Sequence, residues 1–485
     1  MQALNTHTTH IMKRRTKVVA TIGPASSDKE VLKTLIKEGV DVCRLNFSHG
    51  THEDHIKVIK TVREIISEIN YPVAILGDLQ GPKIRIGNIK DNKIILRSGE
   101  QLIMTTKDIL GTAEKVTITY DTFPQDVEIG ERVLVDDGKI MLEVVATNRK
   151  DEVTLKVLHG GVLSSKKGVN LPHTNISQPS LTEKDKIDLE LAIKYDIDWI
   201  ALSFVRSARD IIELKHIIKK SGKNIRVIAK IEKPEAVADL DDIIKESDAI
   251  MVARGDLGVE IPMENVPLIQ KEIIKKSMIH AKPVIVATQM LESMIENISP
   301  TRAEVNDVAN AVMDGADAVM LSGETSVGKH PRAVIDVMNR VIMRIEEEYD
   351  ELYAKEIEPV KNQTRFITDS ICFDACRLSE RVRAKAVVTM TNSGYTAFKI
   401  SSQRPRARIF VYSGNQKLRT MLCLVWGVKT FYYDKMVSTD HTIEDIKYLL
   451  KKDGYLEQGD LIVNTASMPI EERGGTNMLK LSAIE

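Results

Sequence analysis

Eight short apolar runs, rich in β-branched residues, recur along the first two thirds of the chain and are separated by longer amphipathic stretches. They occupy residues 17–23, 40–47, 72–79, 197–204, 225–232, 249–256, 283–289 and 317–324. Continuous apolar runs are typical of strands buried on both faces, as in parallel sheets. Eight such strands in alternation with helices predict an α/β fold, a (β/α)8 TIM barrel, and an open doubly wound sheet is the alternative.

The stretches between the apolar runs carry helix signals. Residues 27–30, 207–210 and 301–304 each have Ser or Thr followed three residues later by Asp or Glu, which is the spacing of a capping box. From Val334 to Ile345, apolar residues recur at the spacing of one helix face. We therefore expect helices to connect the strands.

The interval between the third apolar run and a helix start near Thr182 is too long for a structureless loop. It contains short runs typical of strands and turns, so we expect an inserted β-barrel domain at residues 82–179 that acts as a lid. Its hinges are expected near Gly81 and near Pro179. The barrel then comprises residues 13–81 and 180–352, after an N-terminal extension at residues 1–12.

The alternation of helix and strand restarts near residue 358, which predicts a separate C-terminal α/β domain at residues 358–485. A long helix is expected at about 363–381. The expected strands lie at 386–390, 408–412, 428–433 and 461–465.

Charge and composition exclude several classes of partner. The chain has 68 Lys and Arg against 69 Asp and Glu, a net charge of −1, which favours neither nucleic acid nor an anionic membrane as a partner. No stretch reaches the ~18 consecutive apolar residues of a membrane span, and residues 1–10 lack the apolar core of a secretory signal. The four cysteines are sparse, and Cys372 and Cys376 have helical spacing, which favours buried, reduced thiols. We expect a cytoplasmic protein.

Polar side chains follow the predicted barrel strands, at the end where catalytic residues of such barrels lie. Lys230 and Glu232 are two apart and face the same side, and Asp256 follows the next strand. Two carboxylates on neighbouring strands suit Mg²⁺ or Mn²⁺, and none of the 11 histidines pairs with them as zinc would require. A salt bridge or helix cap is the alternative for any single carboxylate. Gly255 lets the backbone approach a ligand closely. The other residues at these strand ends are Arg44, Asn46, Ser48, Asp78, Arg254, Thr288, Gln289, Ser322 and Glu324.

Seven segments, in one order along the whole chain, resemble the pyruvate kinase family. They are ATIGPAS (20–26), RLNFSHG (44–50), KGVNLP (167–172), AKIE (229–232), ARGDLGVE (253–260), ATQMLESM (287–294) and LSGET (321–325). The resemblance implies phosphoryl transfer from phosphoenolpyruvate to ADP, giving ATP and pyruvate, with a divalent metal. It also implies a barrel with a β lid, a C-terminal effector domain and a homotetramer.

The resemblance implies roles for the matching residues. Glu232 and Asp256 would hold Mg²⁺ or Mn²⁺, and Lys230 would stabilise the charge on the transferring phosphoryl group. The remaining implied roles are those of Arg44 and Arg85 on the phosphates, Thr288 near the enolate, the backbone of Gly255 and Asp256 on the substrate carboxylate, and His49 and Lys167 on the nucleotide.

The sequence departs from many family members near the monovalent-cation site. The resemblance places that site at Asn46, Ser48, Asp78 and the backbone of Leu79. Members that need potassium usually read Asp-Thr-Lys-Gly-Pro-Glu-Ile-Arg, whereas residues 78–85 read Asp-Leu-Gln-Gly-Pro-Lys-Ile-Arg. Lys83 thus replaces an acid, and its ammonium could supply the missing positive charge. We expect no potassium requirement, and a surface lysine at the lid hinge is the alternative. A lysine common in relatives is also replaced by Val327, which leaves any auxiliary charge there open.

A Ser/Thr-rich loop in the C-terminal domain follows a predicted strand and opens a helix, so its hydroxyls and N–H groups could cradle a phosphate. The loop consists of Thr391, Asn392, Ser393, Gly394, Tyr395 and Thr396. Relatives bind a sugar-phosphate effector at such a loop. Fructose 1,6-bisphosphate, ribose 5-phosphate, AMP and no effector remain open, as does an ordinary turn.

Two other functions compete with phosphoryl transfer. A different divalent-metal barrel, such as an aldolase or lyase acting on keto acids, would also use neighbouring Glu and Asp residues. A phosphate-metabolite sensor that lost turnover is the non-enzyme alternative. Lys230 and the motifs on the ADP side favour the kinase.

Overall fold

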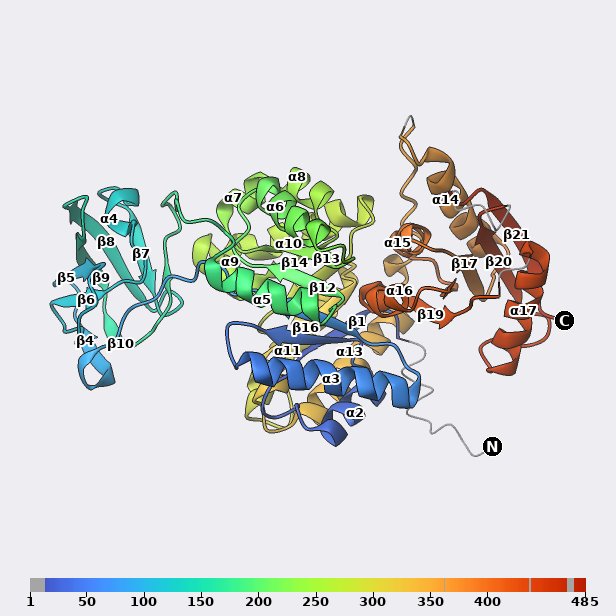
Figure 1. The fold of residues 1–485 in the computed structure, drawn as a ribbon, viewed down its shortest axis with the longest axis horizontal. Coiled ribbons are helices and arrows are strands. Elements are labelled where there is room, and N and C mark those ends of the chain that lie inside the picture. Colours follow the sequence, from blue (N-terminus) through green and yellow to red (C-terminus); the bar gives the residue numbers. More distant parts are fainter. Residues whose placement is uncertain (1–13, 362, 436–437, 469–474) are drawn as a thin grey trace.

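The computed structural model describes residues 14–361, 363–435, 438–468 and 475–485, so the expected extension at 1–12 lies outside the described residues. The eight apolar runs form one closed parallel barrel, which confirms the predicted TIM barrel and rules out the open sheet (Figure 1). Around the barrel the strands are β1 (Lys17–Thr21), β16 (Ala318–Leu321), β15 (Val284–Ala287), β14 (Ala249–Ala253), β13 (Arg226–Ile231), β12 (Trp199–Leu202), β3 (Ala74–Asp78) and β2 (Val42–Asn46).

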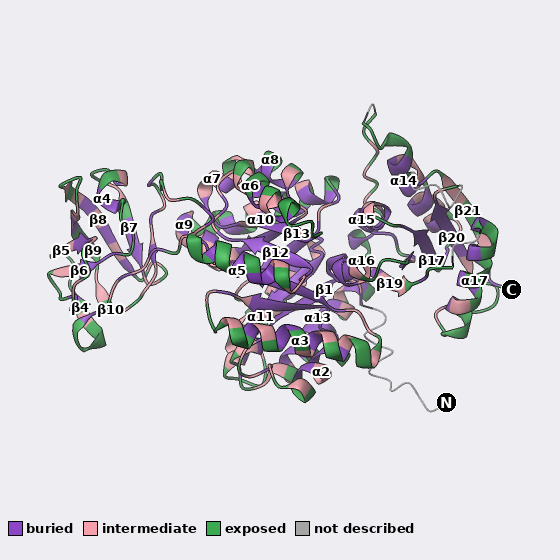
Figure 2. Cartoon of the chain, viewed as in Figure 1, coloured by how far each residue is buried: buried purple, intermediate pink, exposed green. Residues whose placement is uncertain are grey.

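Helices surround the barrel strands, and their outward faces are exposed (Figure 2). The longer ones are α2 (Lys29–Lys37), α3 (His52–Ile69), α5 (Glu183–Lys194), α6 (Ala208–Lys220), α8 (Leu240–Glu246), α10 (Val266–Ile279), α11 (Arg302–Met313) and α13 (Pro331–Glu348). Three short helices follow barrel strands: α7 (Pro234–Ala238) after β13, α9 (Arg254–Glu260) after β14 and α12 (Gly323–Ser326) after β16.

Two of the three expected capping boxes are present, at 207–210 and 301–304. The one expected at 27–30 is wrong. The N-cap of α2 is Asp28, whose carboxylate accepts from the backbone N–H groups of Glu30 (3.0 Å) and Val31 (3.2 Å). A carboxylate one residue further on serves the same purpose as the serine, so the helix begins at Lys29. On α13 the expected apolar stripe is buried at Val334, Val337, Met338 and Ile342 and half-buried at Val341 and Ile345.

The insertion is a β domain with its own apolar core, as predicted, and it lies to one side of the barrel (Figure 1). Its strands form a six-stranded sheet, β11-β7-β8-β9-β5-β6, and a separate pair, β10-β4, rather than one closed barrel. The segment 83–87, one of the short runs typical of a strand, makes only isolated bridges. The strands are β4 (Lys93–Leu96), β5 (Gln101–Thr105), β6 (Lys115–Thr117), β7 (Arg132–Val135), β8 (Ile140–Thr147), β9 (Glu152–His159), β10 (Gly161–Ser164) and β11 (Val169–Asn170), and the one helix is α4 (Phe123–Asp126).

The C-terminal α/β domain contains a five-stranded sheet in the order β19-β18-β17-β20-β21. The first four strands are parallel and match the expected runs, whereas β21 was not expected and pairs antiparallel with β20. The strands are β17 (Ala386–Met390), β18 (Arg408–Ser413), β19 (Val428–Tyr432), β20 (Leu461–Ala466) and β21 (Met478–Ala483). The helices are α14 (Phe366–Arg381), α15 (Tyr395–Ser402), α16 (Gln416–Met421) and α17 (Thr439–Lys452).

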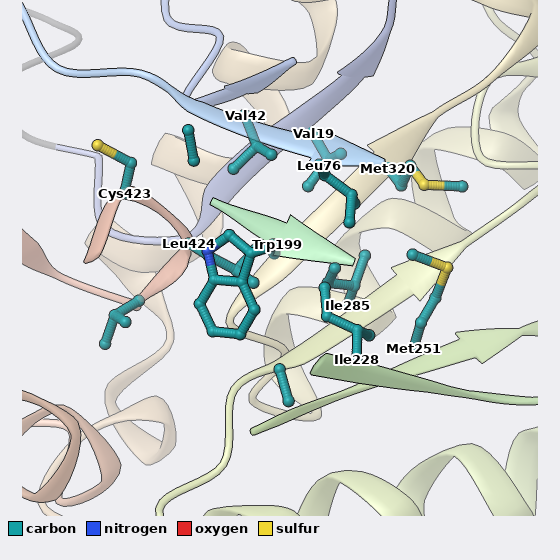
Figure 3. Packing of buried hydrophobic residues seen from close by; sticks show 14 of the residues in the cluster. Val19, Val42, Leu76, Trp199, Ile228, Met251, Ile285, Met320, Cys423 and Leu424 are labelled. Atoms are coloured by element: carbon teal, nitrogen blue, oxygen red, sulfur yellow. The ribbon is translucent and has the colours of Figure 1, made fainter. Parts of the chain in front are cut away.

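The barrel and the C-terminal domain share one apolar core at the amino ends of the barrel strands. Trp199, at the start of β12, is fully buried, and its indole N–H donates to the carbonyl of Met421 at 3.0 Å. Trp199 and Leu424 lie in the same cluster (Figure 3). Because this end is filled with side chains, ligand chemistry is left to the carboxyl ends of the strands. In the described part of the chain, no helix has both the length and the apolar character needed to cross a bilayer.

Candidate active site

The amine of Lys230 lies at the carboxyl end of β13, inside a buried cage of oxygen atoms. Its Nζ lies 2.9 Å from Glu232 Oε1 and 3.2 Å from Asp78 Oδ1, and it donates to Ser203 Oγ at 2.6 Å. Burial lowers the pKa of Lys230, but the carboxylates of Asp78 and Glu232 outweigh it and raise that pKa above its ordinary value. The group is therefore a fixed cation at neutral pH.

Glu232 directly follows β13, and Asp256 follows the neighbouring strand β14 by three residues, as the sequence predicts. Glu232 is 1% exposed, and its Oε2 accepts from the backbone N–H of Phe204 at 2.7 Å. Burial raises its pKa, and the nearby charge of Asp256 adds to that rise. Asp256 is half-buried at the start of α9, and among the described residues its carboxylate has no hydrogen-bond or ion-pair partner.

These two carboxylates fit a hard divalent cation. The described residues contain no cluster of three or more His, Cys, Asp or Glu side chains suited to a metal, and Asp78 at the same mouth is already paired with Arg44 and Lys230, so Glu232 and Asp256 are the candidate ligands. Mg²⁺ is commonly bound by one or two carboxylates together with water and substrate phosphate. Burial and the charge of Asp256 raise the pKa of Glu232. A cation bound to both carboxylates would stabilise their negative charge and lower this pKa again.

The residues expected at a monovalent-cation site are already engaged. Asp78 is buried, and although burial opposes its charge, Lys230 and Arg44 lower its pKa. Arg44 holds it through Nε (2.8 Å) and Nη2 (2.6 Å). The carbonyl of Leu79 accepts from the Ser203 hydroxyl at 2.7 Å, and Asn46 accepts from the backbone N–H of Ser48 at 3.1 Å.

Thr288 occupies a strained position beside Gly255. Its φ of 69° is unusual for a β-branched residue, and its hydroxyl accepts from the Gly255 N–H at 2.8 Å. A Cβ on Gly255 would lie 3.3 Å from Thr288 Oγ1, so a larger residue would crowd this contact. Arg254 donates to the Thr288 carbonyl at 2.7 Å and pairs with Asp307 at 2.6 Å.

The residues expected on the nucleotide side come from the barrel and from the insertion. Burial, and then the charges of Arg85 and Lys83, lower the pKa of His49 below its ordinary value. Arg85 donates to the carbonyl of Lys166 at 3.1 Å. Lys167, by contrast, pairs with Asp136 inside the insertion at 2.8 Å.

A narrow cavity between the insertion and the barrel is lined by Lys83, Asp256, Arg206, Lys233 and Glu260, among others. Lys83 is exposed, and within the described ranges its ammonium has no ion-pair partner. The structure thus brings Lys83 to the same cleft as Asp256.

Sequence reasoning missed several residues that contact the site. Ser203, which accepts from Lys230, lies in the apolar run 197–204, which the sequence predicts only as a strand. Its position near the carboxyl end of that strand is the sequence feature that could have identified it. Lys233 and Glu260 form a buried pair at 2.8 Å beside the two candidate metal carboxylates. Glu260 belongs to a segment that resembles the family, but no sequence pattern around Lys233 indicates that these two residues pair.

The Ser/Thr-rich loop 391–396 lines a separate cavity of about 830 Å³ in the C-terminal domain. Gly394 caps α15 with a φ of 83°, and its N–H donates to Thr391 Oγ1 at 3.0 Å. The hydroxyls of Thr396 and Thr476 lie 2.8 Å apart. Among the described residues that line the cavity, Arg365 carries the one formal charge.

Comparisons with known proteins identify the family of the chain. The pyruvate kinase barrel domain matches residues 13–335, and the pyruvate kinase alpha/beta domain matches residues 369–482. A pyruvate kinase of Corynebacterium efficiens is 46% identical over 96% of this chain and 97% of its own length. One from Geobacillus stearothermophilus is 43% identical over 98% of this chain and 81% of its own length.

A solved structure agrees as well. The crystal structure of a pyruvate kinase from Cryptosporidium parvum superposes with a TM-score of 0.92 at 36% identity, over 98% of this chain and 97% of that one. Family match, identity and fold therefore point the same way, and the chain belongs to the pyruvate kinase family, whose members are phosphotransferases.

Proposed function

We propose that Lys230, Glu232 and Asp256 form the site at which the phosphoryl group of phosphoenolpyruvate passes to ADP, giving ATP and pyruvate. The observation that carries the proposal is the buried Lys230 ammonium, held 2.9 Å from Glu232 at the mouth of the barrel and near the carboxylate of Asp256, which has no partner among the described residues. A fixed cation here faces the place where a transferring phosphoryl group spreads negative charge over its oxygens.

Glu232 and Asp256 would hold Mg²⁺ or Mn²⁺. The bound ion supplies positive charge that orients the substrate and stabilises the phosphoryl oxygens. Lys230 keeps its charge when Glu232 turns to a metal, because Asp78 at 3.2 Å and Ser203 at 2.6 Å remain its partners. The ammonium would therefore keep its place at the barrel mouth while the phosphoryl group is transferred.

The other residues bind and orient the substrates. The N–H groups at Gly255 and Asp256 would hold the substrate carboxylate, which requires the Gly255 N–H to exchange its bond to Thr288 Oγ1 for the substrate, and the Thr288 hydroxyl would support proton delivery to the enolate. The phosphates and the nucleotide would lie against Arg44, Arg85, His49 and Lys167. For Lys167 this requires exchange of its pairing with Asp136 for a phosphate.

We propose that the enzyme needs no potassium. Asp78 is already neutralised by Arg44 and Lys230, the Leu79 carbonyl accepts from Ser203, and Asn46 accepts from the Ser48 N–H, so the acid of the expected cation site already has its counter-charges. The ammonium of Lys83 lies in the cleft with Asp256. Lys83 would supply there the charge that potassium gives to other members.

Loop 391–396 is proposed to bind a phosphorylated effector. Its hydroxyls and the Arg365 side chain line the cavity, and fructose 1,6-bisphosphate, ribose 5-phosphate and AMP are the compounds to test. We also propose a homotetramer, supported by exposed apolar side chains on the outside of the barrel such as Leu268 on α10 and Ile298 in the segment before α11. All four cysteines are free and buried, which supports a cytoplasmic location.

The test is the stoichiometric coupling of phosphoenolpyruvate consumption to ATP formation by the purified full chain. Phosphoryl transfer requires ADP and a divalent cation and gives one ATP per pyruvate. Cleavage of a keto acid without ADP would favour the aldolase or lyase alternative. Binding of phosphate compounds without turnover would favour a sensor.

A further inference from the structure

Lys233 and Glu260 form an ion pair buried between the two segments that carry the candidate metal carboxylates. Their charged atoms lie 2.8 Å apart, and each residue is 4% exposed. Lys233 directly follows Glu232, and Glu260 is the last residue of α9, the seven-residue helix that contains Asp256. The pair therefore ties the end of β13 to the far end of the Asp256 helix.

A buried pair of this kind adds little net stability, because desolvating both charges offsets most of their attraction. Its geometry is nevertheless strict, since displacement of either partner leaves a buried charge without compensation. Groups that orient metal ligands from behind typically change metal affinity by about 10–100-fold when they are removed. The pair is well placed to fix the spacing of Glu232 and Asp256.

The insertion contacts the same carboxylate. Asn170, at the end of β11, donates its side-chain N–H to Glu260 Oε1 at 2.8 Å. Outside the two connecting segments, this is the one side-chain to side-chain hydrogen bond between the insertion and the barrel among the described residues. Figure 1 shows α9 at the end of the barrel nearest the insertion.

The two oxygens of Glu260 are unequally satisfied. Oε1 accepts from both Lys233 and Asn170, while Oε2 is buried and accepts from no group in the described part of the chain. Loss of the Asn170 hydrogen bond would leave this buried carboxylate with a single donor, which is costly. Movement of the lid would therefore change the number of hydrogen bonds that the Glu260 carboxylate accepts.

We propose that Lys233 and Glu260 are positioning residues that set the spacing of Glu232 and Asp256, and that Asn170 makes this spacing depend on the position of the lid. The inference rests on the proposed metal site. In the arrangement described here, Asn170 donates to Glu260 and the pair holds the two carboxylates ready for the divalent cation. When the lid moves away, the pair loosens and the cation is held less tightly.

The test measures Mn²⁺ binding to the full-length protein by electron paramagnetic resonance, without substrates. Asn170→Ala is compared with Asn88→Ala, which makes the same change at an exposed insertion residue whose side chain has no hydrogen bond in the described structure. We expect Asn170→Ala to weaken Mn²⁺ binding by about threefold to tenfold and Glu260→Gln by about tenfold or more. Asn88→Ala should bind as wild type does.

Two further measurements separate positioning from a merely structural role. Amide hydrogen exchange of β11 and α9 should rise together in Asn170→Ala, and by more than the exchange of the other barrel strands. The Mg²⁺ concentration for half-maximal rate should rise while kcat recovers at saturating Mg²⁺. Equal Mn²⁺ affinities of Asn170→Ala and Asn88→Ala would overturn the inference. Glu232→Gln reports on the site itself: unchanged Mn²⁺ affinity in that variant would overturn the proposed metal site, and the role of the pair with it.

Discussion

Lys230 donates to Ser203 at 2.6 Å, and the Ser203 hydroxyl in turn donates to the carbonyl of Leu79 at 2.7 Å. Ser203 therefore connects the candidate catalytic amine by hydrogen bonds to a backbone carbonyl of the expected monovalent-cation site. The negative charge of Asp78 sits in the same network, 3.2 Å from the amine. A change of charge at the expected potassium site should therefore also affect the candidate phosphoryl-transfer site, because the same hydrogen bonds and ion pairs connect the two.

Replacement of Lys230 by Met should abolish turnover while substrates still bind. Removal of a single preorganised charge or donor at a transition state typically costs 10²–10³ in kcat. We expect a loss of at least that size, because the same change leaves Asp78 and Glu232 without their shared cation. The measurement is the steady-state rate of ATP formation, with circular dichroism as the folding control. A kcat within tenfold of wild type would exclude Lys230 from the catalytic role.

Replacement of Lys83 by Glu should create a potassium requirement. In the wild type we expect the rate to change less than twofold when potassium is added to a buffer free of sodium and potassium. In Lys83→Glu the cleft loses a positive charge and gains a negative one, so activity should be low and should rise at least tenfold with potassium. Lys83→Gln is the matched control for loss of the ammonium alone. Strong activation of the wild type by potassium would contradict the proposal.

Arg404 anchors the C-terminal domain to the barrel, and its loss should destabilise the protein markedly. The residue is 1% exposed and holds Asp317, at the start of β16, at 3.0 Å. Arg404→Met leaves a buried carboxylate without its counter-charge, which typically costs about 3–5 kcal/mol of unfolding free energy. Arg406→Met, at an exposed pair with Asp350, should cost less than about 1 kcal/mol. Similar denaturant midpoints for the two variants would refute this difference.

The barrel was predictable because its strands are apolar on both faces, a pattern that few other structures require. The closeness of Lys230 and Glu232 followed from the two-residue period of a strand, and the structure places them 2.9 Å apart. The strand β21 was missed because half of its side chains, Lys480 among them, are exposed at a sheet edge. Its pairing depends on β20, which supplies the partner from elsewhere in the sequence.

Contacts between domains could not be predicted in the same way. Asn170 and Glu260 both belong to segments that resemble the family, but they lie 90 residues apart. Their hydrogen bond depends on how the insertion is tilted against the barrel, which no local pattern encodes. The engagement of Asp78 by Arg44 and Lys230 likewise depends on three different strands meeting at the barrel mouth.

Lys282 should make the stability of the protein rise with pH in the alkaline range. Burial first, and then the charges of Lys215 and Arg226, lower its pKa to about 8 against the opposing pull of Asp248 and Glu246. Its ammonium donates to the carbonyls of Lys245 and Ser247.

The sign of the effect follows from the two states. The unfolded chain keeps the proton on residue 282 up to an ordinary lysine pKa near ~10.4, whereas the folded chain releases it near pH 8. The cost of holding a buried ammonium is therefore full below pH 8 and disappears as the pH rises from 8 toward 10. Relative to Lys282→Met, the wild type should gain on the order of 1–3 kcal/mol of unfolding free energy between pH 7 and pH 10.

Urea unfolding of both proteins at pH 7, 9 and 10 checks this expectation, since other alkaline titrations cancel in the difference between them. Lys245→Met, which removes an exposed lysine from the neighbouring helix α8, should show a difference from wild type that does not change with pH. If the difference between wild type and Lys282→Met is equally flat, Lys282 keeps an ordinary affinity for its proton in the folded protein, because the backbone carbonyls that it contacts then compensate its burial.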